Sequence, residues 1–190
     1  MNGRRTAGTV TAEFSLALLA FLTFSLGVLE VARALYVINM LPMITQRAAI
    51  AAANTNVRDA AALAAVRQQA MFRNGPGMLT MGTPISDAHV RIDYLALAGP
   101  AGAMMTPVAG SALPNCPANN RIACMKDLYG PECVRLVRVR ICDPAATATC
   151  ERVPFQSLLS FSRLPFRLPV AASIVSAESL GARPGDGPCP

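Results

Sequence analysis

The hydrophobic positions of the chain gather first in one long N-terminal run. Residues 14–29 carry no charge, and adding residues 30–33 gives about 20 residues, which as a helix span the roughly 30 Å hydrocarbon core of a bilayer. Residues 34–53 remain apolar and helix-compatible, although Pro42 lacks the N–H that continues the helical hydrogen bonds, which predicts a kink. The pattern therefore predicts a transmembrane and stem helix over residues 9–53.

Charged residues stand at both ends of this run. Glu30 and Arg33 lie three residues apart on one helix face, and they are followed by Tyr36, a residue type enriched at membrane interfaces. We interpret these three as a group at the outer membrane interface, with Glu30 and Arg33 paired and their long side chains reaching the headgroups. Arg4 and Arg5 precede the run, so the positive-inside rule predicts a cytoplasmic N-terminus and a C-terminal part on the other side.

The rest of the chain predicts a second helix followed by strands. A helical pattern lies in the segment 54–73, with Asn56 as its N-cap. The Gly- and Pro-rich region 74–190 contains three strand candidates: 89–94 and 133–142, in which apolar and polar residues alternate, and 168–176. A slip in the alternation at residues 136–137 predicts a β-bulge. The predicted fold class is therefore α+β, with a long N-terminal helix followed by a small antiparallel β-sheet domain.

Six cysteines lie in the C-terminal part of the chain: Cys116, Cys124, Cys133, Cys142, Cys150 and Cys189. An even number confined to one region predicts disulfides in an oxidising compartment. A zinc site is disfavoured because the closest cysteines are eight residues apart and the chain has one histidine. The repeated spacing predicts a bond between Cys142 and Cys150 across the ends of a hairpin, and a bond between Cys116 and Cys124 that closes a second small loop. By elimination, Cys133 would then pair with Cys189.

Composition argues against several classes of function. The formal net charge is +6, but Lys and Arg are scattered, aromatic residues make up 5% of the chain and Trp is absent, which disfavours nucleic-acid binding. We find no phosphate-binding loop, nucleophile elbow, paired-carboxylate site or metal-ligand motif. The one histidine, His89, is predicted to point outward from a strand. The sequence thus predicts a protein that is not an enzyme and that uses no catalytic residue, metal, cofactor or small-molecule substrate.

The start of the apolar run carries a motif. Gly8 and Thr9 are followed by Glu13 and Phe14, in the string GTVTAEF. This string, the preceding basic residues and the following GVLEVARALYVINMLPMITQRAAIAAA resemble the TadE-like pseudopilins of the tight-adherence (Flp) pilus system. The resemblance covers residues 4–53, with a weaker similarity in LPFRLPVAASIVSAESLG near the C-terminus.

The resemblance implies a minor pseudopilin that takes part in pilus assembly. A prepilin peptidase would cut after Gly8 and release the leader 1–8. Glu13, one helical turn after the new α-ammonium of Thr9, could then pair with that amine or with a neighbouring subunit's, an attraction of about 4 kcal/mol at 4 Å and an effective dielectric of 20. The implied partners are other pilin-like subunits and the inner-membrane assembly platform. The implied location is the bacterial inner membrane, with the head 74–190 in the periplasm.

Two alternatives remain open. The first is an ordinary signal peptide, since Ala32-Arg33-Ala34 has the small-x-small pattern for a cut before Leu35, which would release a secreted Cys-rich binding domain. The second is an uncut single-pass protein that scaffolds an envelope complex. The N-terminal residue of the mature protein distinguishes all three.

Overall fold

The computed structural model describes residues 7–99, 104–147, 149–158, 166–177 and 179–182. Its fold class is α+β, which confirms the prediction. The elements in chain order are α1 (Ala7–Ala53), α2 (Ala60–Ala70), the 3-10 turn η1 (Asp87–His89), β1 (Val90–Ala98), β2 (Met104–Pro107), the 3-10 turn η3 (Gly110–Ala112), α3 (Pro117–Lys126), β3 (Leu136–Ile141) and β4 (Ala172–Ser176).

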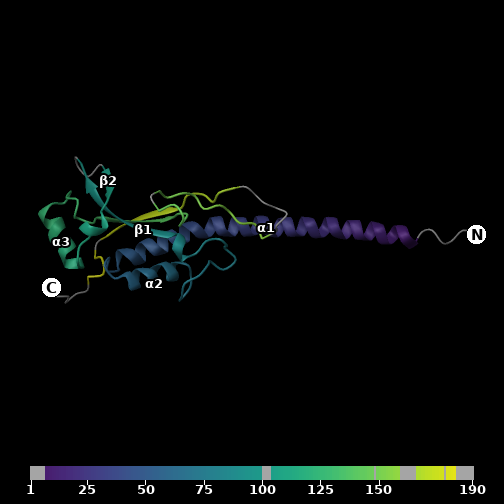
Figure 1. Cartoon of the computed structure of the whole chain (residues 1–190), viewed down its shortest axis with the longest axis horizontal. Coiled ribbons are helices and arrows are strands. Elements are labelled where there is room, and N and C mark those ends of the chain that lie inside the picture. The colour runs from purple at the N-terminus through teal and green to yellow at the C-terminus, as the bar shows by residue number, and fades with distance from the viewer. Residues whose placement is uncertain (1–6, 100–103, 148, 159–165, 178, 183–190) are drawn as a thin grey trace, which may run out of the picture.

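The long helix α1 is the axis of the molecule. Its N-terminal half projects from the head as a bare rod, and its C-terminal half lies inside the head between the sheet and α2 (Figure 1). The helix is unbroken across Pro42, where the Thr45 hydroxyl donates to the Pro42 carbonyl at 3.0 Å. The same hydroxyl lies 2.9 Å from Ser173 Oγ in β4 and so connects the first element of the chain to the last.

The four strands form one antiparallel sheet in the order β2-β1-β3-β4. The residues of β3 pair one-to-one with β1, from Leu136 opposite Leu95 to Ile141 opposite Val90. The predicted bulge at residues 136–137 is therefore wrong. Leu136 instead opens the strand on the same face as the arginines of β3, and the alternation continues from it without a slip.

The core lies where the inner face of the sheet packs against α1. Val37, Leu41 and Ile44 on α1 and Val137 and Val139 on β3 have no exposed surface. The buried alanines of α1 that follow Ile44 let the sheet and the helix approach closely. The C-terminal half of α1 is thus the hydrophobic core of the head as well as its stem.

The start of α2 differs from the prediction. Asp59, not Asn56, is the N-cap, and its carboxylate accepts the Ala62 N–H at 2.9 Å. Asn56 Oδ1 accepts the N–H of Arg58 at 2.9 Å, in a side-chain turn that precedes the helix. Both residues bond the backbone as their chemistry predicts, but the turn places the N-cap three residues later than the sequence predicts.

The disulfides confirm one predicted bond and correct two others. Cys142 and Cys150 are bonded as predicted, whereas Cys124 is bonded to Cys133. Cys116 is disulfide-bonded too, and its predicted bond to Cys124 is wrong, as is that of Cys133 to Cys189, which lies outside the described residues. The reason is α3: Cys116 caps its N-terminus and Cys124 lies inside it. The helical rise separates them by about 12 Å, beyond the about 7 Å limit for disulfide-bonded Cα atoms.

The C-terminal segment closes the fold against the end of α1. Leu180 is buried, and its N–H donates to the Ala53 carbonyl at 3.0 Å. Gly181 follows with φ +85°, and a Cβ there would come within 2.7 Å of the backbone nitrogen of Asn56. Only glycine fits both this conformation and this close approach.

Candidate functional site

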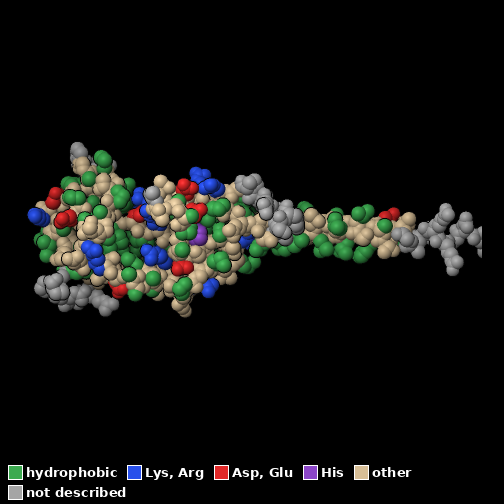
Figure 2. Space-filling view, in the orientation of Figure 1, with side chains coloured by type: hydrophobic (Ala, Val, Ile, Leu, Met, Phe, Trp, Pro, Cys, Tyr) green, Lys and Arg blue, Asp and Glu red, His purple; other side chains and the backbone are tan. Residues whose placement is uncertain are grey.

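The bare segment of α1, residues 9–29, is the most distinctive surface of the molecule. Figure 2 shows it as a rod of hydrophobic side chains outside the head. An 18-residue window of α1 has a mean hydropathy of 2.1, so the helix is long and apolar enough to cross a membrane. The hydroxyls of Ser15 and Thr23 donate to the carbonyls of Ala12 and Leu19, so these donors are satisfied within the helix.

The residues of the predicted cleavage and assembly motif occupy the tip of this segment. Gly8 and Thr9 both lie inside α1, which begins at Ala7. Glu13 and Phe14 are exposed. Because the helix is continuous from Thr9 to Glu13, the two residues lie one turn apart on the same face, as the sequence predicts.

Glu30 and Arg33 mark the point where the bare segment enters the head. Arg33 Nη2 lies 3.3 Å from Glu30 Oε1, so the predicted ion pair forms. Its surroundings differ from the expectation, because both residues are only 5% exposed. Their side chains turn into the loops of the head rather than outward to the headgroups. Tyr36 remains partly exposed next to them.

Arg33 binds two loops that are distant in sequence. Its Nη1 atom donates to the carbonyls of Met81 and Thr83 at 3.4 and 3.2 Å. Its Nη2 atom donates to the carbonyl of Gln156, and the guanidinium lies over the Phe155 ring, 4.7 Å from the ring centroid. The planar fork of arginine holds these acceptors with donors in fixed directions, whereas lysine presents its three donors from a single atom.

Glu30 also binds the second of these loops, which contains Gln156 and Leu158. Both of its carboxylate oxygens accept the N–H of Leu158, at 3.2 and 3.4 Å. A buried charge is tolerated when it is paired and hydrogen-bonded, and Glu30 meets both conditions. The pair therefore fixes the head to α1 at the end of the bare segment. The i,i+3 spacing predicts the pair, but no local signal identifies the loops that cover it.

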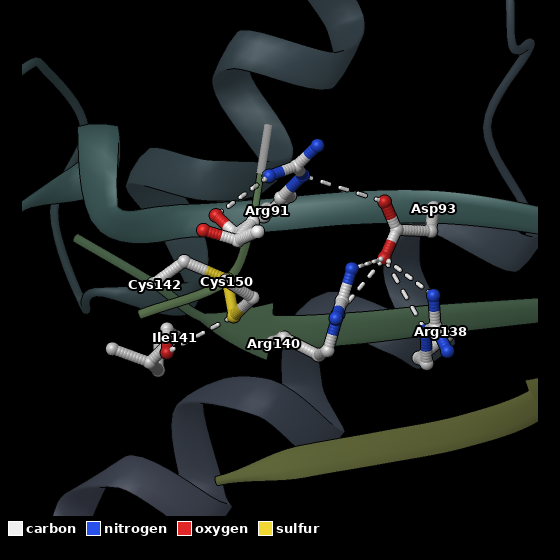
Figure 3. A network of polar contacts seen from close by, with 8 residues as sticks. Arg91, Asp93, Arg138, Arg140, Ile141, Cys142 and Cys150 are labelled. Carbon is white, nitrogen blue, oxygen red and sulfur yellow. Dashed lines mark hydrogen bonds and ion pairs between the residues drawn. A yellow bond between two sulfur atoms is a disulfide. The ribbon is translucent and has the colours of Figure 1, made fainter. Parts of the chain in front are cut away.

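A second charged cluster lies on the outer face of the sheet (Figure 3). Asp93 Oδ2 accepts from Arg138 and Arg140 at 3.2 and 2.6 Å, and Asp93 Oδ1 lies 3.6 Å from Arg91. Arg138 and Arg140 face outward from β3, as the sequence predicts, but they share a carboxylate from β1. The shared carboxylate holds the three guanidinium groups in a cross-strand network and balances one of their three positive charges.

His89 corrects the prediction of an outward-facing strand residue. It ends η1, is 9% exposed, and its Nδ1 accepts the Ser86 N–H at 3.1 Å, which leaves the ring proton on Nε2. Burial lowers the pKa of His89, against the weaker opposing attraction of Asp143 and Asp87. The sequence signal was the serine three residues earlier, because Ser86 and His89 cap the turn reciprocally.

This lowered pKa predicts a pH-dependent stability. We expect the free energy of unfolding to be highest above about pH 6.5 and to fall as the pH drops below it, because the unfolded chain then binds a proton that folded His89, with its lowered pKa, resists. Urea unfolding at several pH values measures this slope. His89→Asn keeps an acceptor for Ser86 but cannot titrate, so it should flatten the curve. Equal slopes for the two proteins would contradict the prediction.

Within the described residues, no group of three or more His, Cys, Asp or Glu side chains is placed to hold a metal ion. Comparison of the chain with protein-family models, with curated proteins and with solved structures found no match. The features of the chain that bear on its function are therefore the bare helix, the buried ion pair and the disulfide-bonded head.

Proposed function

We propose that the protein is a minor pseudopilin of a tight-adherence-type pilus, with the bare segment of α1 in the bacterial inner membrane and the head in the periplasm. The observation that carries the proposal is the division of one unbroken helix into a bare apolar half and a half that forms the core of an α+β head. A chain built in this way presents the helix to lipid or to other helices and the head to the aqueous side.

The disulfides support the orientation. Cys124–Cys133 and Cys142–Cys150 both lie in the head, on the far side of the bare segment from the N-terminus. Such bonds persist in the periplasm and are rare in the cytosol. The arginines before the helix favour the same orientation independently, because positive charge stays on the cytoplasmic side.

The buried ion pair argues against release of the head as a secreted domain. A cut before Leu35 would remove Glu30 and Arg33, which bind the two loops next to α1. It would also leave the head without one end of its core helix. The structure of α1 therefore favours cleavage near its N-terminus or no cleavage over cleavage at Ala34.

The N-terminal residue of the mature protein tests the proposal. We expect co-expression with a prepilin peptidase to convert the chain from Met1 to Thr9, by mass spectrometry of the purified membrane protein. Glu13→Ala should still be cleaved but should fail to assemble with partner subunits, because the proposed partner of the Thr9 amine is gone. Ser15→Ala, on the same bare segment, is the matched control and should assemble normally.

The other possible outcomes of this experiment distinguish the alternatives. A mature N-terminus at Leu35 would indicate a secreted domain, and retention of Met1 in the presence of the peptidase would indicate an uncut envelope scaffold. Normal assembly of cleaved Glu13→Ala would remove the pairing role of Glu13 while leaving the processing step intact.

A further inference from the structure

Two loops of the head contact α1 where the bare segment meets the head. Each of them has one apolar side chain exposed on the surface. Arg33 holds the Met81 carbonyl, and Glu30 holds the Leu158 N–H. The side chains of Met81 and Leu158 are nevertheless 71% and 67% exposed. The ion pair thus fixes the backbone of both loops and leaves the side chains pointing away from the core.

Met81 adopts an unusual conformation to do this. Its φ is +56°, in the left-handed region that a bulky side chain rarely occupies. The turn is fixed by the Gly82 N–H, which donates to the Leu79 carbonyl at 2.8 Å, and by the contact with Arg33. A strained residue that is held with its apolar side chain outward points to a role for that side chain outside the fold.

Met81 and Leu158 border an open groove against α1. The groove has a cavity volume of about 460 Å³, and Leu26, Leu29 and Tyr36 line its helix side. Among the described residues that line it, the charged side chains are Glu30 and Arg33, which neutralise each other. The groove is therefore an apolar surface that continues directly from the bare segment onto the head.

The length of the bare segment sets the level of this groove relative to the bilayer. Residues 9–29 are about 20 residues long and extend about 30 Å as a helix, which matches the hydrocarbon core of a bilayer. If this segment fills the core, the groove begins at the level where acyl chains meet headgroups. Leu26 and Leu29 then lie in lipid, and Met81 and Leu158 lie at the same level or just above it.

We propose that Met81 and Leu158 form a membrane rim that dips into the outer leaflet of the inner membrane, with a lipid acyl chain occupying the groove. This proposal rests on the transmembrane role proposed for the bare segment. Exposed Met and Leu side chains and an aromatic ring at one level are the chemistry that the boundary of a bilayer accepts. The rim would hold the head against the membrane in one orientation rather than leave it free to tilt.

The absence of tryptophan from the chain permits a direct test. We would place single tryptophans by Met81→Trp and Leu158→Trp in the full chain, at one copy per lipid nanodisc, and measure quenching by lipids brominated near the top of the acyl chain. Leu22→Trp, in the middle of the bare segment, is the positive reference. Met125→Trp is the matched control, because Met125 is 88% exposed on α3, at the end of the head far from the bare helix.

We expect Met81→Trp and Leu158→Trp to lose most of their emission in brominated lipid and to emit at shorter wavelength than Met125→Trp, which should not be quenched. Because every variant carries the same new side chain, any general affinity of tryptophan for lipid is common to all. If both rim variants behave like Met125→Trp while Leu22→Trp is quenched, the rim is excluded and the membrane span stands. If Leu22→Trp is not quenched, the span itself is excluded. If the rim tryptophans emit at shorter wavelength only in discs that hold two copies, and brominated lipid does not quench them there, a second chain covers the rim. That result would overturn the lipid proposal.

Discussion

Replacing Arg33 with methionine is expected to lower the free energy of unfolding by about 3–5 kcal/mol, the usual cost of removing one partner of a buried ion pair. Methionine keeps much of the volume of the arginine stem but leaves the Glu30 carboxylate buried without its cation. It also removes the donors to the carbonyls of Met81, Thr83 and Gln156. Urea unfolding of the full chain in detergent micelles, followed by circular dichroism, measures the change.

Two further variants separate the buried pair from a general effect of charge. Arg47→Met removes one exposed arginine from the same helix, where the guanidinium lies 4.8 Å from the Phe72 ring centroid, and should cost about 1 kcal/mol or less. The double variant Glu30→Gln with Arg33→Met should recover part of the loss, because no lone charge remains buried. If Arg33→Met and Arg47→Met unfold at the same urea concentration, the pair does not hold the head to α1.

Replacing Leu41 with alanine is expected to destabilise the head by about 2–5 kcal/mol. Leu41 has no exposed surface and belongs to the cluster formed by α1 and the sheet, so its truncation leaves a cavity that rigid neighbours fill only in part. Met43→Ala is the matched control, since Met43 is 53% exposed two residues away on the same helix, and it should change stability by less than about 0.5 kcal/mol. Both variants would be measured by urea unfolding in the same micelles.

An equal effect of the two substitutions would contradict the assignment of the core. It would mean that the C-terminal half of α1 is not the surface on which the sheet folds. A large effect of Leu41→Ala alone would establish that the helix proposed to cross the membrane also determines the stability of the head.

Regular patterns in the sequence predicted the parts of the fold that depend on local chemistry. The uncharged run at the start of α1 and the alternation of Val137, Arg138 and Val139 in β3 needed no tertiary information. The strand β1 was located by the same alternation, and β4 lies inside the strand candidate 168–176, although the bounds of both were shifted. By contrast, β2 and α3 lie in a region rich in Gly and Pro and are short, so neither has a periodic signal strong enough to be recognised.

The errors came from contacts between distant segments. Equal spacing of cysteines suggested a bond between Cys116 and Cys124, but an unrecognised helix separates them. His89 was expected to be exposed because a strand pattern covers it, and it is buried in a turn that it helps to cap. The candidate site was predicted in its residues but not in its environment. The spacing of Glu30 and Arg33 gave the pair, whereas the two loops that bury it lie about 50 and 120 residues further along the chain.

The packing of β4 against α1 has a consequence for biogenesis. Helix α1 supplies the core surface, and the strand that covers one side of it, Ala172–Ser176, is made only after the intervening helices and strands. The hydrogen bond between Thr45 and Ser173 spans 128 residues of sequence. The head therefore cannot close until β4 has been made, and until then the face of α1 that β4 covers stays open to non-native contacts. If the head is exported as we propose, this face needs a chaperone or the translocation channel to shield it from water during export.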